Sequence, residues 1–270
     1  MNGSNTAAEL IWRDFGKTIY GKFRKAVEQY RLVSEGDRIA VCISGGKDSM
    51  LLALCMRQLQ KYGGVPFELE FLAMDPGYSA ENRDAIMRNV QFLDIPLKMH
   101  STKVFESAEK SGGNPCFLCS RLRRGWLYKT AKEMGCNKIA LGHHFDDVIE
   151  TILMGMLYGS QIQTMMPKLR SKNYEDVQVI RPLYLVRESD IIEWSERSGL
   201  SFLGCACAVT SKDSAGSKRS EIKELLCRLR ETNPAVDMNI FRSVENIDLN
   251  RIVSYHNGSE YHHFLDDYDK

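Results

Sequence analysis

The sequence predicts an α/β protein with a doubly wound parallel sheet, an N-terminal helix and a small C-terminal helical extension. Short apolar runs rich in β-branched residues alternate with amphipathic stretches of helical period between residues 38 and 197. The first apolar run leads directly into a glycine-rich turn that opens a helix. With 270 residues, of which 43% are hydrophobic, the chain is large enough to bury a sizeable core.

The expected elements follow in chain order. Apolar side chains spaced three and four apart predict an entry helix over residues 7–32, which a polar stretch ends. Short runs bounded by turn residues predict the strands 38–44, 67–74, 97–101, 138–141 and 177–181. Amphipathic stretches predict the helices 48–62, 79–93, 121–134, 146–157 and 188–197. Ser79 is the expected N-cap of the second of these helices.

The pattern divides the chain into three expected segments. Residues 1–36 form an N-terminal helical segment, and residues 37–200 form the α/β domain. Residues 201–270 hold a cysteine-containing loop and two closing helices, expected at 220–230 and 235–247. The tail from residue 250 shows no clear period and is predicted to be loosely held.

The composition indicates a cytoplasmic protein with no membrane partner. No apolar run reaches the roughly 18 residues that a membrane-spanning helix needs, and residues 1–8 lack the apolar core of a signal peptide. Lys and Arg number 36 against 35 Asp and Glu, so only a local basic patch could attract nucleic acid. In a reducing cytoplasm the 8 cysteines are expected as free thiols, metal ligands or redox groups.

The strongest motif is the string SGGKDS at residues 44–49, between the first expected strand and the helix after it. Its glycines let the backbone approach an anion, and the helix N-terminus favours phosphate. Lys47 adds positive charge, and Asp48 beside phosphates suggests a bridging Mg²⁺. The spacing differs from the Walker loop, and the alternative interpretation is an ordinary Gly-Gly turn of a βα unit.

This string resembles the SGGxDS loop of the N-type ATP pyrophosphatases (PP-loop proteins), which cleave ATP between its α and β phosphates and transfer AMP. The segment GHHFDD at residues 142–147 resembles the GHHxDD segment of the tRNA-thiolating branch. The resemblance implies ATP and Mg²⁺ as cofactors, with Lys47 and Asp48 as catalytic residues. The nucleotide-binding residues that it implies are Ser44, Gly45, Gly46, Lys47, Asp48, Ser49, Asp75, Gly142, His143, Asp146 and Asp147. From the residues alone, one of the paired aspartates is as readily a helix cap.

Two cysteine clusters indicate a metal or redox centre. Cys116 and Cys119 form a C-x-x-C followed by three nearby arginines, which favour the thiolate form that metals bind. Cys205 and Cys207 lie in a loop-like stretch far downstream. Zinc, iron–sulfur and dithiol chemistry all remain open at this spacing. Three ligands on a [4Fe–4S] cluster would leave one iron free to hold sulfide. Cys42, Cys55, Cys136 and Cys227 are expected as inert thiols.

Residues 116–128 resemble the tRNA 2-thiocytidine synthetase family, and matching residues in the same order extend from about residue 39 to about residue 207. In that family the C-x-x-C and one later cysteine hold a [4Fe–4S] cluster, which implies Cys116, Cys119 and Cys205 as ligands. The family has a second C-x-x-C at the later site. This chain has Cys-x-Cys there, so Cys207 is the alternative third ligand.

The resemblance implies an ATP-dependent tRNA sulfurtransferase. It would adenylate the C2 oxygen of the cytidine at anticodon-loop position 32 and replace that oxygen with sulfur. Implied partners are tRNA and a sulfur donor such as a cysteine desulfurase, and the chain is a candidate homodimer. Two basic sets are either RNA contacts or solvated helix faces: residues 121, 123, 124, 129 and 132, and residues 212, 218, 219, 223, 228 and 230.

Other functions stay open on the residues alone. A lysidine-type synthetase shares the phosphate loop but has no need of the clustered cysteines. A PP-loop thiolase that modifies another RNA base or a small molecule would use both features. A nucleotide sensor accounts for the loop but not the cysteines, and a zinc-stabilised binding module accounts for the cysteines alone. Iron absorbance in an anaerobic preparation separates an iron–sulfur cluster from zinc.

Overall fold

A computed structural model describes residues 3–102, 115–171, 174, 176–203 and 217–268 of the chain; within these ranges, the side chains of residues 3–6, 115–117, 119 and 120 are not described. Its centre is a six-stranded sheet with the order β3-β2-β1-β4-β6-β5. Five strands are parallel, which confirms the predicted fold class: β1 (Arg38–Cys42), β2 (Glu68–Asp75), β3 (Leu97–Ser101), β4 (Lys138–Ala140) and β6 (Gln178–Ile180). β5 (Lys168–Arg170) pairs with β6 in the antiparallel sense and was not predicted.

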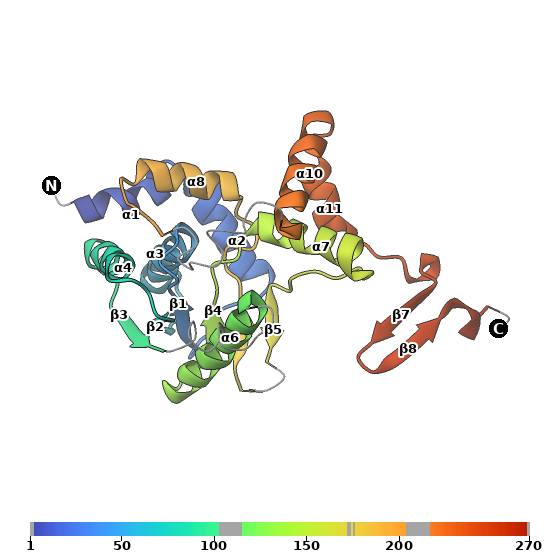
Figure 1. Cartoon of the computed structure of the whole chain (residues 1–270), viewed down its shortest axis with the longest axis horizontal. Coiled ribbons are helices and arrows are strands. Elements are labelled where there is room, and N and C mark those ends of the chain that lie inside the picture. The colour runs from blue at the N-terminus through green and yellow to red at the C-terminus, as the bar shows by residue number, and fades with distance from the viewer. Residues whose placement is uncertain (1–2, 103–114, 172–173, 175, 204–216, 269–270) are drawn as a thin grey trace.

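Helices cover both faces of the sheet (Figure 1). α3 (Lys47–Tyr62), α4 (Ala80–Phe92) and α8 (Glu188–Arg197) pack with Ile39 and Val41 in the main core. α6 (Pro115–Glu133) packs on the opposite face, where Ala131 contacts a separate cluster that includes Ala40. Ile39, Ala40 and Val41 thus show the alternation of a strand that is buried on both faces.

The entry segment is three helices instead of the single helix predicted. α1 (Gly3–Arg13) and α2 (Gly21–Gln29) flank a π-helical turn at Gly16–Tyr20. The Tyr20 N–H donates to Phe15 O over 3.2 Å, which is the five-residue spacing of a π turn. Leu10 and Phe23 lie in the main core with the sheet, and Trp194 Nε1 donates to Ala7 O over 3.0 Å.

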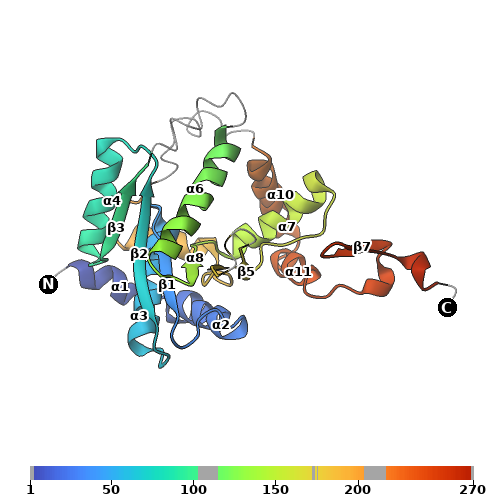
Figure 2. The same cartoon turned by 90° about the horizontal axis from the view of Figure 1, so that it is seen from below.

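The C-terminal part contains two helices and a hairpin. α10 (Lys218–Thr232) and α11 (Val236–Ser243) pack on α7 (Phe145–Gly159). β7 (Ser254–Asn257) and β8 (Glu260–His263) then pair around Gly258, whose φ is +65°. The hairpin projects away from the main body (Figures 1 and 2). The sequence did not predict this hairpin at residues 254–263, and whether the tail is loosely held stays a prediction.

The switch in strand order positions the site. From β1 the chain builds outward to β2 and β3, then returns to β4 on the other side of β1. In open α/β sheets, ligands bind in the crevice outside the carboxyl ends of the strands at such a point. The SGGKDS and GHHFDD segments follow β1 and β4, so both border this crevice.

In the described part of the chain, no helix has the length and apolar character needed to cross a bilayer.

Candidate nucleotide-binding crevice

The SGGKDS loop is held by its own serines. Ser49 Oγ accepts from the Ser44 N–H at 3.1 Å and donates to Gly46 O at 2.9 Å. Gly46 is the N-cap of α3, and no side chain caps the helix. The N–H groups of the first turn therefore stay available to an anion, reinforced by the helix dipole.

Two glycines allow neighbouring segments to approach this loop closely. Gly45 has a φ of +87°, and a β-carbon there would lie 2.7 Å from Ile86 Cγ1. A β-carbon at Gly142 would lie 3.1 Å from the carbonyl carbon of Asp48 and 3.2 Å from Ser49 N. The segment after β4 is thus packed directly against the beginning of α3.

Residues near the second cysteine pair reach the same loop. The Leu203 N–H donates to Gly45 O over 3.1 Å, and Leu203 precedes Cys205 by two positions. Cys205 and Cys207 lie outside the described residues. The chain therefore approaches the phosphate loop just before these cysteines.

The first cysteine pair begins α6. Pro115 is the first residue of this helix, six residues before the predicted start at residue 121. Cys116 and Cys119 therefore lie in its opening turns. Their side chains are not described. Because α6 leads into β4, its first turns lie toward the carboxyl edge of the sheet. His100, near the end of β3, contacts the Trp126 ring at 5.5 Å between centroids, which places α6 beside β3.

Lys47 and Asp48 face each other at the beginning of α3. Lys47 Nζ lies 3.1 Å from Asp48 Oδ1 and 3.5 Å from Glu188 Oε1. Asp48 Oδ1 is buried, and it accepts no hydrogen bond from any group that the structure describes. Its nearest charged group is the Lys47 ammonium, which meets it as an ion pair without forming a hydrogen bond, so the oxygen keeps the capacity to bind a second cation. Where side chains are described, no three carboxylate, imidazole or thiol groups converge on a metal position. One carboxylate together with nucleotide phosphates is a usual Mg²⁺ environment.

Asp75 fixes the turn at the end of β2. Its side chain is 1% exposed and accepts from the N–H groups of Gly77 at 2.9 Å and Tyr78 at 2.7 Å. Arg83 forms an ion pair with its other oxygen at 2.6 Å. Burial alone would raise the pKa of Asp75, but these hydrogen bonds hold it below its ordinary value. The turn brings the Tyr78 hydroxyl to 3.5 Å from Ser44 O. Asp75 therefore helps to position the phosphate loop indirectly, by holding the turn that carries Tyr78.

The GHHFDD segment forms the beginning of α7. His144 is the N-cap, and its Nδ1 accepts from the Asp147 N–H at 3.4 Å. Asp147 Oδ2 accepts in return from the His144 N–H at 3.0 Å, which completes a capping box. Asp147 thus caps the helix, the role left open for one aspartate. Asp146 instead accepts from the Glu188 N–H at 2.7 Å and from Arg230 at 2.9 Å.

His143 lies in the same segment and is held neutral. Burial, followed by the charge of Arg181, lowers its pKa to about 4. Its Nδ1 is buried without a hydrogen-bond partner among the described groups. An unpaired buried polar atom is uncommon and suits a ligand contact.

An ion network that the sequence did not predict fastens α10 over this site. We call it the α10 network: Asp147, Glu150, Glu188, Arg219 and Lys223. Arg219 bonds Glu150 at 2.6 Å and Asp147 at 2.7 Å, and Lys223 bonds Glu188 at 3.1 Å. These partners are 69, 72 and 35 positions apart, so no local pattern could reveal them.

Ion pairs of this network and nearby pairs include part of the two basic sets. Arg219 and Lys223 are paired with carboxylates of α7 and α8, and Arg230 bonds Asp237 at 3.0 Å. In the first basic set, Lys132 pairs with Asp176 at 3.0 Å. These pairs link α10 and α6 to neighbouring segments and offset part of the positive charge of the two sets. Lys212 lies outside the described residues.

Three of the remaining cysteines behave as expected of inert thiols. Burial raises the pKa of Cys42 to about 12, and burial also raises the pKa of Cys55 and Cys136. Such thiols are protonated and unreactive near neutral pH.

The comparisons with known proteins agree with this geometry. A family model described as a PP-loop domain matches residues 17–207. The chain is 39% identical to a tRNA-cytidine(32) 2-sulfurtransferase of Alkalilimnicola ehrlichii, over 82% of this chain and 70% of the relative. It is 35% identical to a protein of the same name from Geotalea uraniireducens, over 88% of this chain and 96% of the relative.

A solved structure shows the same fold. The U34-tRNA thiolase of Methanococcus maripaludis, described with its [4Fe-4S] cluster, aligns with a TM-score of 0.65 at 23% identity. The alignment covers 84% of this chain and 79% of that chain. The crevice, the SGGKDS loop that borders it and these matches together show that the chain belongs to the PP-loop family and, within it, to the tRNA-cytidine(32) 2-sulfurtransferases.

Proposed function

We propose that this chain is an ATP-dependent tRNA sulfurtransferase that converts the cytidine at anticodon-loop position 32 to 2-thiocytidine in the cytoplasm. The observation that carries the proposal is the hydrogen bond from Leu203 to Gly45, since it joins the chain leading to Cys205 to the phosphate loop. The reaction needs activation by ATP and delivery of sulfur at one place.

Adenylation makes the base oxygen a leaving group. The C2 oxygen of cytidine attacks the α phosphorus of ATP, and the bond to pyrophosphate breaks. A sulfur nucleophile then adds at C2, and the C–O bond breaks with release of AMP. Lys47 and the free N–H groups of α3 bind the phosphates and offset the charge that develops on them. Asp48 would hold Mg²⁺, which supplies further neutralisation of phosphate charge.

The sulfur side rests on the cysteines. Cys116, Cys119 and either Cys205 or Cys207 would bind a [4Fe–4S] cluster that leaves one iron open to sulfide. The position of α6 toward the carboxyl edge of the sheet supports this assignment. The sulfide would come from a donor such as a cysteine desulfurase.

Two substitutions separate the two half-reactions. Asp48→Ala should abolish pyrophosphate release while the iron content and visible absorbance of the anaerobic protein stay unchanged. Cys116→Ala should remove the cluster while ATP binding and pyrophosphate release persist. Cys55→Ala, at a thiol buried in the main core, is the control. If both test variants thiolate tRNA at the wild-type rate, these site assignments are wrong.

Nucleoside analysis identifies the product. Transfer RNA from cells lacking the gene should lose 2-thiocytidine and keep its other thionucleosides. Loss of a different thionucleoside would move the substrate to another base, and no loss would remove tRNA as the substrate.

We also propose that the chain functions as a homodimer. The hairpin of β7 and β8 projects from the body and exposes aromatic and aliphatic side chains, including Tyr261 and Leu265. An isolated two-stranded hairpin is marginally stable in water, so this one needs a surface to cover it. A second copy offers that surface.

A further inference from the structure

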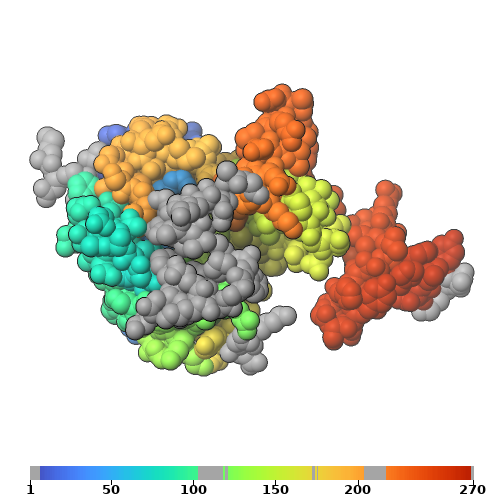
Figure 3. Space-filling view, viewed as in Figure 1, coloured from blue at the N-terminus to red at the C-terminus, as the bar shows by residue number. Residues whose placement is uncertain are grey.

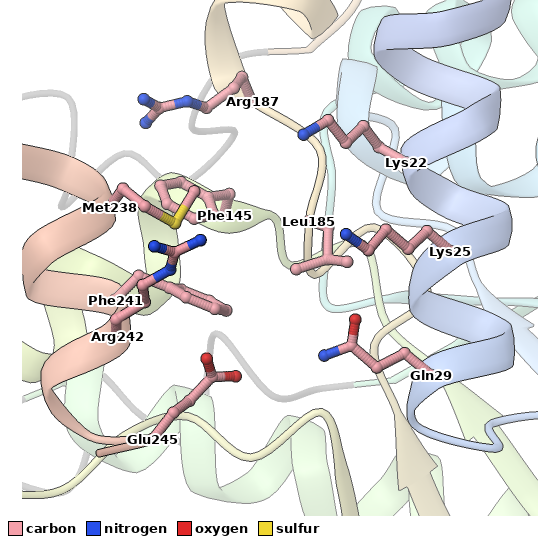
Figure 4. Close-up of a pocket in the computed structure, with 10 residues that line it drawn as sticks. All are labelled: Lys22, Lys25, Gln29, Phe145, Leu185, Arg187, Met238, Phe241, Arg242 and Glu245. Carbon is pink, nitrogen blue, oxygen red and sulfur yellow. The ribbon is translucent and has the colours of Figure 1, made fainter. Parts of the chain in front are cut away.

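A pocket of about 210 Å³ lies between α2 and α11 (Figure 4). It is open on one side and has one wall from each of these helices, while the beginning of α7 and the chain before α8 form its floor. Among the residues that the structure describes, none from the phosphate loop lines it.

Cationic side chains from both walls point into the pocket. Lys22 and Lys25 extend from α2, and Arg242 extends from α11 toward them (Figure 4). None of these three forms an ion pair with a side chain that the structure describes, whereas the cations of the α10 network are paired with carboxylates. Glu245 is the one carboxylate in the lining, and it accepts from the Tyr30 hydroxyl at 3.3 Å. With three cations that lack an ion-pair partner among the described side chains and one carboxylate, the walls carry a net positive charge.

The floor is apolar and aromatic. Phe145 and Phe241 stack with their ring centroids 4.9 Å apart, and Leu185 lies beside them. Met238, which is 37% exposed, completes the surface at the α11 wall. Phe145 and Phe241 are only 2% and 5% exposed, so the floor offers an apolar surface for a base or ribose to pack on, while the cations match an anionic phosphate.

The pocket adjoins the nucleotide crevice through two residue pairs. Phe145 lines the pocket, while the preceding residue, His144, caps α7 at the crevice. Arg187 lines the pocket and packs over the Phe145 ring at 4.4 Å, while the next residue, Glu188, faces Lys47. The two sites therefore lie on opposite sides of the first turns of α7 and α8.

We propose that this pocket binds a nucleotide of the substrate RNA, with its phosphate held by Lys22, Lys25 and Arg242 and its base or ribose on the apolar floor. The inference rests on the proposed function, since it takes tRNA as the substrate. Free charge on two facing helices suits a phosphodiester chain that passes between them. Whereas Arg219 and Lys223 of α10 are paired with carboxylates, this pocket supplies cations without an ion-pair partner among the described side chains, close to the crevice.

The test is RNA binding by a double variant, Lys22→Ala/Lys25→Ala. Fluorescence anisotropy with labelled tRNA should show about tenfold weaker binding at moderate salt. The slope of log K against log salt should fall by about one to two, because each lost phosphate contact removes about one from it. The conservative variant Lys22→Arg/Lys25→Arg should restore both values.

A matched control removes the same charge elsewhere. Lys61→Ala/Arg88→Ala takes two exposed cations from α3 and α4 and should leave the tRNA affinity within about twofold of wild type. Binding of a fluorescent ATP analogue should stay unchanged in all variants, which shows that the fold and the crevice are intact.

The outcomes separate this inference from the proposed function. If wild type binds tRNA and the double variant matches it in affinity and slope, the pocket does not contact RNA and the inference is overturned. If the double variant keeps tRNA binding but loses binding of polyglutamate that wild type shows, the pocket takes an acidic protein, which also overturns it. If wild type itself binds no tRNA, the proposed function fails first.

Discussion

Gly142 has no room for a side chain, because the backbone of Asp48 and Ser49 lies where its β-carbon would be. The close approach couples the end of β4 to the beginning of α3, so the phosphate loop cannot shift independently. Space at a single residue thus controls the shape of the anion site. Gly45 also controls the shape of the phosphate loop, because its φ is +87° and a β-carbon there would collide with Ile86.

Gly142→Ala should weaken ATP binding more than it weakens the fold. The added methyl group pushes against backbone at 3.1 Å, which displaces the free N–H groups of α3. We expect the Kd of an ATP analogue to rise about tenfold or more, with about 1–2 kcal/mol lost from the free energy of unfolding. Titration calorimetry and denaturant unfolding measure the two effects.

Gly125→Ala is the control for that experiment, since no atom lies within 4 Å of its β-carbon position. It should leave ATP binding unchanged and stabilise α6 by about 0.5–1 kcal/mol. Equal Kd values for the two variants would show that contact at Gly142 does not shape the loop.

His143 should make stability depend on pH. Its folded pKa is lowered to about 4, while the unfolded chain has the ordinary value of 6.5. Between these two pH values the His143 imidazole is protonated in the unfolded state and neutral in the folded state. Its contribution to the free energy of unfolding is therefore fully present above pH 6.5 and is lost as pH falls toward 4. Between pH 7 and pH 5 the loss should be about 2 kcal/mol.

Denaturant unfolding at the two pH values measures this loss. His143→Asn should remove the difference, while His100→Asn, at an exposed imidazole, should retain it. A wild-type protein equally stable at pH 5 and pH 7 would contradict a buried neutral His143.

Residue roles could be predicted where a local motif carries them. The sequence predicted the SGGKDS loop and a helix cap by one of the two paired aspartates, because strand, turn and helix signals lie within a few positions of each other. Glu188 could not be found, since Lys47, Lys223 and His144 reach it from distant parts of the chain. The turn that Asp75 fixes was also invisible without Arg83 and the N–H groups it bonds.

At the scale of elements, α10 is held mainly by charge on its polar side and by Ile222 and Leu226 on its apolar side. The Glu150 side chain is 3% exposed and the Arg219 side chain is 43% exposed. The buried partner of this pair is therefore the acid. Loss of the two members of the pair should have unequal effects, because an unpaired charge costs most where water cannot reach it.

Arg219→Ala should destabilise the protein by about 3 kcal/mol, because Glu150 and Asp147 both lose their closest cation. Glu150→Gln should cost only about 1 kcal/mol, since Arg219 keeps Asp147 and its exposed part keeps water. Denaturant unfolding of the two variants checks the order. If Glu150→Gln is the more damaging change, the network does not anchor α10 as described.

Element boundaries show where local patterns end. Strand β3 was predicted at its observed residues, and Ser79 caps α4 through Asn82 N at 3.3 Å. α6 begins at Pro115, six residues before the predicted start at residue 121. β5 has three residues and depends on β6 for its pairing, so it carries no strand signal of its own. The Asn257-Gly258 turn of the last hairpin was the missed local signal.

At the scale of the whole molecule, the α/β core and the C-terminal hairpin differ in how they are supported. The core buries side chains of α1, α2, the sheet and α8 in one cluster. The hairpin stands clear of the body in the space-filling view (Figure 3). The alternation of apolar segments in the sequence predicts the α/β core. It does not predict the hairpin of β7 and β8, because apolar side chains that pack on a second molecule leave no such pattern.

Two surfaces of the chain complement each other. Around the hairpin, Val253, Tyr261 and Leu265 are exposed by 66%, 57% and 58%, and acidic side chains at residues 260, 266 and 267 lie among them. After α7, Ile162 and Met166 are exposed by 57% and 51%, close in sequence to basic residues 168 and 170. An acidic apolar surface and a basic apolar surface on one chain favour reciprocal docking between two copies. The acidic hairpin would repel RNA.

Removal of residues 248–270 should therefore convert a dimer to a monomer, as sedimentation velocity would show at micromolar concentration. Tyr261→Ser/Leu265→Ser should weaken the dimer by about 2–4 kcal/mol, since two apolar side chains lose the surface that covers them. Ile192→Ser, on α8 and 41% exposed, is the matched control and should leave the dimer intact. A truncated chain that still sediments as a dimer would place the interface elsewhere, and a full-length chain that stays monomeric would mean that the hairpin is covered by another partner.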